Sequence, residues 1–535
     1  MQKFKLAAAA ALLPFAAVAL SSSVAVAASG AKGSEQARVI VAYKDGQRGS
    51  AERALAMAGA ETHYDLSAQN SFAVSLPAVA VEGLSRNPAI EYVEEDAKRY
   101  PLSLADSQTV PYGIKLTQAD QVSDAVAANA QVCIIDSGLD VMHPDHNADG
   151  TYGLVIKGYS DTGKGSWTTA SPPTWSSDEN HHGTHVAGTI AARNNSLGVV
   201  GVAPNGKLNL YIVKVFGASG WAYSSSLVDA LNRCIASRDN TAVDGFPGKK
   251  LVVSMSLGGS IKNRTEETAF NNAYTKKDVL PIAAAGNGGN NRVSYPAGYS
   301  GVMSVAAIDI TKAKASFSQY NSDVEISAPG VGVLSTVPIN QGLEAYVTAG
   351  TNFGADGMDG SPKAVVTGKL VNCGIGDTAC TAAAGQVCLI QRGTIAFADK
   401  VLNCQAGGGK AAVIYNNVAG DLIGTLNGTM TNIPSVGVSD TTGTTLLGKV
   451  GTSATVGVAV ADYAKFDGTS MATPHVSAIA ALIWSYAPKC TNAQVRTALT
   501  STAIDLGATG RDTKFGYGLV QAQGAKDALV ALNCN

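Results

Sequence analysis

The chain has 535 residues, of which 46% are hydrophobic and 15% are charged, and its formal net charge is −2. The apolar fraction excludes global disorder, and the near-neutral charge excludes a basic nucleic-acid-binding surface at the level of the whole chain. The length predicts several domains. The longest apolar stretch, residues 6–20, is interrupted by Pro14 and is shorter than the roughly 20 residues that a membrane span needs.

The first residues have the pattern of an export signal. Lys3 and Lys5 precede an apolar run, and Ala-Val-Ala at residues 25–27 is a small-x-small cleavage pattern. We expect a signal peptide at residues 1–27, with a buried alanine-rich helix as the alternative. Its removal implies a secreted, extracellular protein without a membrane span, and the even count of 8 cysteines suits an oxidising compartment.

The next block, residues 28–106, contains no cysteine and no obvious catalytic cluster. Its patterns follow the order strand, helix, strand, helix, strand, which predicts a small ferredoxin-like unit. The expected elements are strands at residues 39–43, 72–76 and 90–94 and helices at residues 51–57 and 79–84.

Strand and helix patterns alternate from residue 107 onward, which is typical of a parallel sheet covered by helices. The expected strands are residues 131–135, 208–215, 251–254, 279–284 and 302–307. The expected helices are residues 182–192, 225–236 and 470–485. The last helix is almost uniformly small and apolar, so we expect it to be buried.

Residues 347–460 interrupt this α/β pattern. They are rich in Thr, Gly, Ala and Val, carry few charges and hold four of the cysteines. Short strand-like runs recur at residues 387–390, 411–415 and 455–460. We therefore expect an inserted, mostly β domain, and we expect the α/β domain to consist of residues 107–346 and 461–535.

Three segments place a reactive side chain at the edge of the α/β sheet. Asp136 ends an apolar strand, where ligands collect in open α/β folds. His182 and Ser470 each stand at the start of a small-residue helix. Each residue alone is more often a cap or a structural residue. Together they supply a carboxylate that orients an imidazole, and an imidazole that activates a hydroxyl as nucleophile.

Five motifs in this order resemble those of the subtilisin family of serine endopeptidases. They are residues 134–138 (IIDSG), 182–189 (HGTHVAGT), 255–259 (MSLGG), 283–287 (AAAGN) and 468–475 (GTSMATPH). The resemblance covers residues 107–346 and 461–531. It implies a subtilisin-like fold with Asp136 as the orienting carboxylate, His182 as the general base and Ser470 as the nucleophile.

The resemblance also implies an oxyanion donor and the walls of a substrate cleft. Asn287 matches the donor, and a side-chain amide in that position is typically worth about 3 kcal/mol; alone, it would be a turn residue. Gly288 stands where some relatives have an acid, so we expect no charge that selects basic side chains. The residues that match substrate-binding positions are Ser256, Leu257, Gly258, Gly259, Ala284, Ala285, Gly286, the floor residue Ser294 and the outer-subsite residue Tyr223.

A structural calcium site is implied in the same way, with an Asn-rich turn that binds no ion as the alternative. Oxygen ligands suit this hard cation. The matching ligands are the side chains of Gln108, Asp145 and Asn195 and the carbonyl groups of Arg193, Leu197 and Val199.

Two further blocks resemble domains found in some subtilisin relatives. Residues 28–106 resemble the pro-peptide, which would act as folding template and inhibitor and be cut between residues 100 and 108, before Ser107. Residues 347–460 resemble a protease-associated domain, inserted just before the segment that carries Ser470.

Eight cysteines allow 105 connectivities, so the disulfide pairing stays open. Proximity and domain membership favour Cys373–Cys380, Cys388–Cys404 and Cys490–Cys534, which leaves Cys133–Cys234.

These features lead us to expect a secreted, calcium-dependent, monomeric endopeptidase that is made as a pre-pro-enzyme. Its partners would be protein or peptide substrates and its own pro-peptide. One alternative is a catalytically silent homologue that binds proteins or peptides. Another is a serine esterase, but the Gly-x-Ser-x-Gly elbow is missing around Ser470 and the Asp-first order is wrong for that fold.

Overall fold

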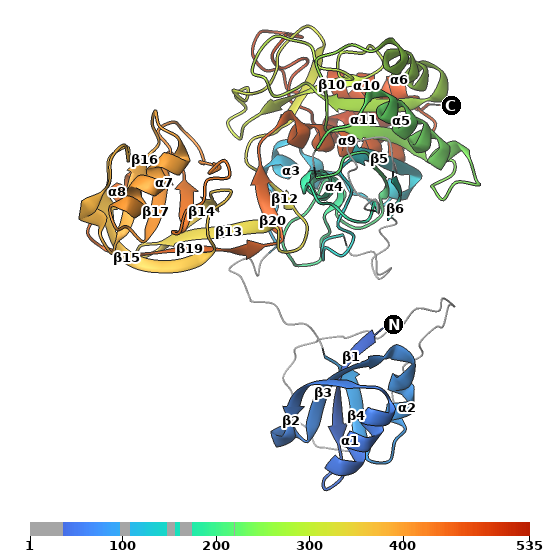
Figure 1. The fold of residues 1–535 in the computed structure, drawn as a ribbon. Helices are drawn as coiled ribbons and strands as arrows, with labels where there is room; N and C mark the ends of the chain where they lie inside the picture. Colours follow the sequence, from blue (N-terminus) through green and yellow to red (C-terminus); the bar gives the residue numbers. More distant parts are fainter. Residues whose placement is uncertain (1–35, 97–107, 147–155, 161–173, 219, 535) are drawn as a thin grey trace, which may run out of the picture. The chain divides into compact units, whose positions relative to one another are not determined.

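The computed structural model describes residues 36–96, 108–146, 156–160, 174–218 and 220–534 (Figure 1). The chain divides into two compact units, Met1–Leu102 and Ser103–Asn535. The expected signal peptide and the expected cleavage before Ser107 lie outside the described residues. Within the described ranges, no helix combines the length and the apolar character that crossing a membrane requires.

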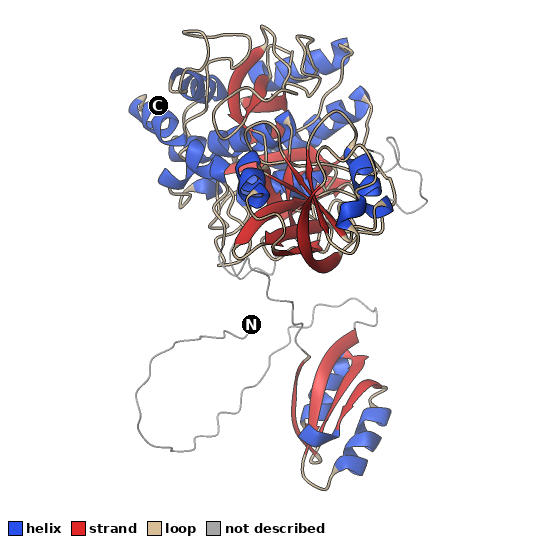
Figure 2. Ribbon diagram, turned by 90° about the vertical axis from the view of Figure 1, so that its left-hand side faces the viewer, coloured by secondary structure: helices blue, strands red, loops and turns tan. Residues whose placement is uncertain are grey.

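The N-terminal unit is a four-stranded antiparallel sheet with the strand order β2-β3-β1-β4. Its helices lie on one face of the sheet (Figure 2), which is the ferredoxin-like arrangement that the sequence predicts. Strand β2 was not expected, because its polar side chains are exposed and carry no apolar alternation. The elements are β1 (Gln36–Tyr43), α1 (Arg48–Met57), β2 (Glu61–Leu66), β3 (Ser71–Pro77), α2 (Val81–Ser85) and β4 (Ile90–Glu95).

The second unit is built on a seven-stranded parallel sheet with the order β11-β10-β9-β8-β5-β7-β6. Most of its strands are buried along their whole length, as expected for a sheet covered on both faces. Strands β6 and β11 were not expected, because both mix polar with apolar residues. The strands are β5 (Ala130–Asp136), β6 (Ile156–Ser160), β7 (Asn209–Lys214), β8 (Lys250–Met255), β9 (Val279–Ala284), β10 (Met303–Ile308) and β11 (Val324–Pro329).

Helices cover both faces of this sheet. Helices α4 and α9 pack into one core with strands from across the sheet, whereas α5 and α6 pack against the opposite face. Helix α9 is buried along nearly its whole length, as its composition predicts, and Pro474 lies within its first turns. The helices are α3 (Tyr112–Leu116), α4 (His182–Ala191), α5 (Ser224–Asp239), α6 (Arg264–Lys277), α9 (Thr469–Tyr486), α10 (Asn492–Ser501) and α11 (Ala522–Ala531).

The inserted segment forms a closed barrel with the strand order β13-β14-β18-β17-β16-β15-β19 (Figure 1, yellow to orange). An antiparallel ribbon of β12 (Val333–Thr336) and β20 (Tyr463–Phe466) lies where the chain enters and leaves it. The barrel elements are β13 (Gly342–Thr348), β14 (Asn352–Gly357), β15 (Ala364–Asn372), β16 (Val387–Gln391), α7 (Phe397–Ala406), β17 (Ala411–Tyr415), β18 (Ser435–Val438), α8 (Asp440–Leu447) and β19 (Ser453–Ala461).

Four disulfides are present, and they are the pairs that the sequence analysis favoured: Cys133–Cys234, Cys373–Cys380, Cys388–Cys404 and Cys490–Cys534.

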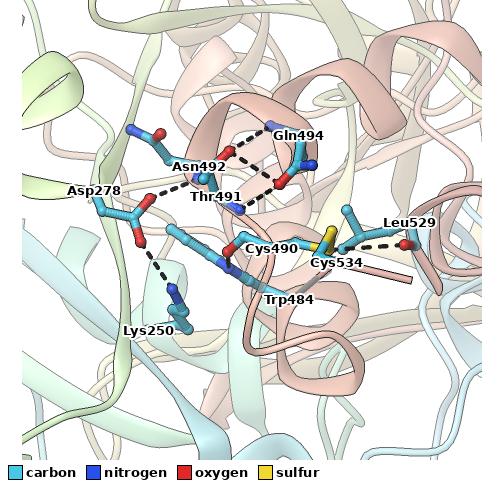
Figure 3. The surroundings of a disulfide bond; sticks show 9 residues. All are labelled: Lys250, Asp278, Trp484, Cys490, Thr491, Asn492, Gln494, Leu529 and Cys534. Carbon is cyan, nitrogen blue, oxygen red and sulfur yellow. Dashed lines mark hydrogen bonds and ion pairs between the residues drawn. A yellow bond between two sulfur atoms is a disulfide. The ribbon is translucent and has the colours of Figure 1, made fainter. Parts of the chain in front are cut away.

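The last pair fastens the C-terminal helices to the rest of the unit (Figure 3). The indole nitrogen of Trp484 donates to the Cys490 carbonyl at 2.8 Å. The backbone N–H of Asn492, the first residue of α10, donates to Asp278 Oδ1 at 2.8 Å. Asp278 in turn pairs with Lys250 of β8 at 2.8 Å, so covalent and polar contacts tie α9, α10 and the sheet together.

Four buried histidines among the described residues of this unit have a pKa lowered by burial, namely His143, His146, His185 and His475, and they make its stability sensitive to acid. Burial lowers the pKa of His185 to about 3 and that of His475 to about 4. An unfolded histidine titrates near 6.5, so between these values the unfolded chain binds protons that the folded chain does not. Stability is therefore complete above about pH 6.5 and is lost as the pH falls toward the folded pKa values.

We expect the free energy of unfolding to decrease between pH 6.5 and 5 by up to about 1.4 kcal/mol per pH unit for each such histidine. Urea denaturation at several pH values measures this slope. His475→Gln removes one titrating group and should flatten it, whatever its effect on absolute stability. An unchanged slope in His475→Gln would contradict the assignment.

Candidate active site

The three candidate catalytic residues lie on elements that the parallel sheet organises. Asp136 is the last residue of β5, at the carboxyl end of a central strand. His182 is the first residue of α4, and Ser470 is the second residue of α9. Helices α4 and α9 pack against each other and against β5. The sequence therefore placed all three residues correctly on their elements.

Asp136 and His182 are in direct contact. Asp136 Oδ1 accepts a hydrogen bond from its neighbour's backbone N–H at 2.8 Å and lies 2.8 Å from His182 Nδ1. The Asp136 side chain is fully buried, whereas that of His182 is 26% exposed. Burial acts to lower the pKa of His182, but the charge and hydrogen bond of Asp136 outweigh it, so the net pKa is raised.

Asp178 holds the start of α4 in place. Its carboxylate accepts from the backbone N–H of His181 at 3.0 Å and from the backbone N–H of Thr184 at 2.8 Å. A carboxylate at this position satisfies free N–H groups of the first turn and faces the positive end of the helix dipole. Asp178 also contributes to the raised pKa of His182. Asp178 was not predicted from the sequence, although an acid shortly before a helix start is a capping signal.

Ser470 is hydrogen-bonded to the wall of the cleft. Its hydroxyl donates to the Ser256 carbonyl at 3.0 Å, and the Ser256 hydroxyl donates to the Ser470 carbonyl at 2.7 Å. Among the hydrogen bonds of the described residues, none joins Ser470 to His182. The residue that follows β8 thus positions the first turn of α9.

The side-chain amide of Asn287 has a defined orientation. Its Oδ1 accepts from the backbone N–H of Thr469 at 2.9 Å and from the Thr469 hydroxyl at 2.8 Å. Because a backbone N–H can only donate, the atom that faces it must be the oxygen. The Nδ2 group is thereby left to donate elsewhere, and both Asn287 and Ser470 line the same pocket.

That pocket has a volume of about 410 Å³. It brings together six of the nine predicted substrate-binding residues, namely Leu257, Gly258, Gly259, Ala284, Gly286 and Ser294. Ser256, Ala285 and Tyr223 are outside its lining. Ala285 is 1% exposed and packs behind the wall. Tyr223 is 57% exposed and contacts Trp221 edge-on at 5.1 Å.

Gly258 leaves little room where the floor meets the wall. A Cβ on Gly258 would lie 2.4 Å from Ser294 Oγ, so a side chain there would displace the Ser294 hydroxyl. The backbones of Gly259 and Tyr295 exchange two hydrogen bonds of 2.8 Å, which hold the two segments together.

The pocket lining includes residues that the sequence analysis did not identify: Ser260, Asn290, Arg292, Val293, Gln319 and Thr469. Arg292 is the charged member of this lining. No sequence motif marks Arg292, because it lies in an irregular loop. The one sequence signal that could have identified it is its position two residues before Ser294.

The predicted calcium ligands converge on one point. Gln108 Nε2 lies 3.3 Å from Asn195 Oδ1, 2.9 Å from the Leu197 carbonyl oxygen and 3.2 Å from the Val199 carbonyl oxygen, and it also contacts the carbonyl oxygen of Arg193. An amide nitrogen has two hydrogens, so it cannot satisfy four acceptors.

Asp145 lies beside this oxygen cluster. It is fully buried, and its carboxylate accepts from Asn195 Nδ2 at 2.9 Å and from the Val199 backbone N–H at 3.2 Å. Burial raises the pKa of Asp145 to about 6, despite these hydrogen bonds and one from Tyr463. A nearby cation would restore the ordinary preference for the ionised carboxylate. The donor set, which is made of oxygens around a common point, therefore fits a hard cation.

Comparison with protein families gives two matches. The subtilase family model matches residues 127–360 and 440–518. The PA domain model matches residues 366–446, within the inserted barrel. A subtilase unit interrupted by a PA domain is the organisation that the two matches describe.

Individual proteins agree with this. The chain is 31% identical over 519 residues to alkaline elastase YaB of Bacillus sp. (strain YaB), with 95% of each chain covered. It is 40% identical over 267 residues to an alkaline protease of Alkalihalobacillus alcalophilus, covering 50% of this chain and 61% of that protein. A psychrophilic subtilisin-like protease, Apa1, from the Antarctic psychrotroph Pseudoalteromonas sp. AS-11 has a similar structure, with a TM-score of 0.64, 41% identity and coverage of 78% of this chain and 98% of that one.

The motifs, the parallel sheet with its edge residues and these matches have one explanation: the chain belongs to the subtilase family and is a subtilisin-like serine endopeptidase with an inserted PA domain.

Proposed function

We propose that this endopeptidase cleaves proteins through Asp136, His182 and Ser470, and that it is secreted and processes itself from a pre-pro-enzyme. The observation that carries the proposal is the 2.8 Å contact between Asp136 Oδ1 and His182 Nδ1, together with a pocket that Ser470 and Asn287 line.

In this mechanism, Ser470 Oγ attacks the carbonyl carbon of the scissile bond and His182 Nε2 accepts its proton. Because His182 Nδ1 faces the Asp136 carboxylate, Nδ1 carries the hydrogen of the neutral ring and Nε2 is available as base. The Ser470 hydroxyl first rotates away from the Ser256 carbonyl. Catalytic hydrogen bonds commonly form fully only when substrate is bound.

Asn287 Nδ2 would donate to the oxygen that becomes negatively charged in the tetrahedral intermediate. Its orientation is set before substrate arrives, because Thr469 holds Oδ1. The raised pKa of His182 means that the neutral, base form is lost as the pH falls through that pKa. Cleavage should therefore become faster as the pH rises through it.

The remaining domain assignments follow from this function. Residues 1–27 would be the signal peptide and residues 28–106 the pro-peptide, which would template folding and inhibit the mature enzyme. Residues 107–346 and 461–535 would be the peptidase domain, active as a monomer on protein or peptide substrates, with residues 347–460 as the insertion. The ferredoxin-like sheet of the N-terminal unit supports the pro-peptide assignment.

A calcium ion would be held by Gln108, Asp145 and Asn195 and by the carbonyl groups of Arg193, Leu197 and Val199. When bound, it would supply the positive charge that this ring of oxygens and a buried carboxylate need. The Gln108 amide would turn its oxygen toward the ion. These residues lie at the start of the described part of the peptidase unit and in the loop after α4. An ion bound between them would link the two segments and oppose local unfolding.

Ser470→Ala should abolish both proteolysis and processing, because one nucleophile serves both reactions. We expect casein hydrolysis to fall by several orders of magnitude, labelling by a fluorophosphonate to disappear and the precursor to stay uncleaved. Ser477→Ala is the matched control, since Ser477 lies on the same helix, is buried and its hydroxyl has no hydrogen-bond partner among the described residues. Maturation of purified Ser470→Ala protein would refute the mechanism. If the wild-type protein were labelled but did not hydrolyse casein, the result would favour an esterase. If it were neither labelled nor able to hydrolyse casein, the result would favour a silent binding protein.

Chelation of calcium should lower thermal stability. A ligand that binds the folded state at 100 times its Kd contributes about 2.7 kcal/mol, so inactivation should be faster in EDTA and slow again when calcium is restored. Asn195→Ala should lose most of this calcium-dependent shift in Tm. Asn194→Ala, which changes an exposed neighbour, should retain it. Equal half-lives with and without calcium would count against the site.

The pocket should favour large apolar residues before the cut bond. Its walls at Ala284, Gly286 and Gly258 are small, and burial of a large apolar side chain contributes roughly 1.5–3 kcal/mol. Discrimination among apolar side chains should be shallow, at about 10–200-fold. A peptide library varied at this position measures the preference. A strict requirement for lysine or arginine would contradict the prediction.

A further inference from the structure

Arg292 is the one charged residue among the described residues that line the catalytic pocket. The rest of the lining consists of glycine, alanine, leucine, valine, serine, threonine, asparagine and glutamine. The same pocket is lined by Ser470 and Asn287, so a charge on its wall acts on the side chain of any substrate that occupies it.

The backbone at Arg292 is fixed to the pocket wall. Its carbonyl oxygen accepts from Gln319 Nε2 at 2.5 Å and from Asn321 Nδ2 at 2.9 Å. Gln319 is itself anchored, because its backbone N–H donates to the Gly286 carbonyl at 2.9 Å. The loop that carries Arg292 is thereby tied to the wall segment that ends at Asn287.

The side chain of Arg292 is exposed and has no carboxylate within ion-pair distance among residues 36–96, 108–146, 156–160, 174–218 and 220–534. By contrast, Arg496 in the same unit is paired with Glu325. A guanidinium group keeps its charge at every accessible pH and binds carboxylates through two parallel hydrogen bonds. Arg292 is thus an exposed cation in the lining of the pocket, without an ion-pair partner among the described residues.

We propose that Arg292 is a specificity-determining residue that lets the pocket accept glutamate before the cut bond, in addition to large apolar residues, and that it disfavours lysine and arginine. This inference rests on the proposed function, since it assigns the pocket to the residue before the scissile bond. The uncharged walls accommodate the aliphatic part of glutamate, and its carboxylate pairs with Arg292. A lysine in the same place meets a like charge and no acid.

The test compares kcat/KM for four peptide p-nitroanilides that differ only before the cut bond, with Phe, Glu, Gln or Lys. Glutamate and glutamine have nearly the same shape, so the ratio of kcat/KM for the Glu and Gln peptides reports the effect of charge. Because both values come from the same variant, a general change in its activity cancels. We expect a Glu/Gln ratio of about five in the wild type, which is the upper range for a partly exposed ion pair. The ratio should shrink in about 1 M salt through screening.

Arg292→Gln should bring the Glu/Gln ratio to about one, and Arg292→Glu should reverse it and raise the Lys/Gln ratio several-fold. Lys489→Gln removes the same charge at an exposed position outside the pocket and should leave both ratios as in the wild type. Equal Glu/Gln ratios in the wild type and in Arg292→Gln would overturn the inference about Arg292. Hydrolysis of the Phe peptide by the same proteins would still uphold the proposed function. Failure of the wild type to cleave any of the four peptides would overturn both.

Discussion

The antiparallel pairing of β12 with β20 is the interaction on which the geometry of this active site depends. The ribbon is fastened to α4, because Ser335 and Thr336 each donate a side-chain hydrogen bond of 2.8 Å to carbonyl groups of that helix. Phe466 of β20 stacks on His185 of α4 at 4.3 Å, and the chain then enters α9 at Thr469. One two-stranded element therefore contacts the helix of the candidate base and leads directly into the helix of the candidate nucleophile.

The same ribbon carries the inserted barrel and reaches the oxygen cluster. Lys465 pairs with Asp356 of the barrel at 3.1 Å and with Asp421 at 3.0 Å. Tyr463, two residues earlier on β20, is hydrogen-bonded to Asp145, one of the proposed calcium ligands. An insertion that ends just before Ser470 would ordinarily threaten the precision of the site. Here its return strand is held by strand pairing, ring stacking and ion pairs before α9 begins.

The sequence predicts an element well where its residues must be buried, and poorly where they are exposed. Asp136 lies where a buried apolar strand ends, and His182 and Ser470 lie where buried helices begin. Such patterns can be recognised in a sequence because one face or both must be excluded from water. Strand β2 has exposed polar side chains and β6 mixes polar with apolar residues, so neither has a periodic signal. Their pairing depends on neighbouring strands that are distant in sequence.

Asn287 could be predicted from the sequence and Arg292 could not, and the difference lies in how the fold constrains their side chains. The Asn287 amide is constrained by Thr469, and Asn287 stands at the end of the motif at residues 283–287. The position of Arg292 is held through its backbone: its carbonyl oxygen accepts from Gln319 and Asn321, and its N–H donates to Asn290 Oδ1 at 2.9 Å. Any residue except proline has both groups. Its side chain is therefore unconstrained by the fold and is available to set substrate preference. Packing and hydrogen bonding thus position the candidate catalytic residues at the ends of buried elements, whereas the charge of Arg292 lies on a loop that the core does not dictate.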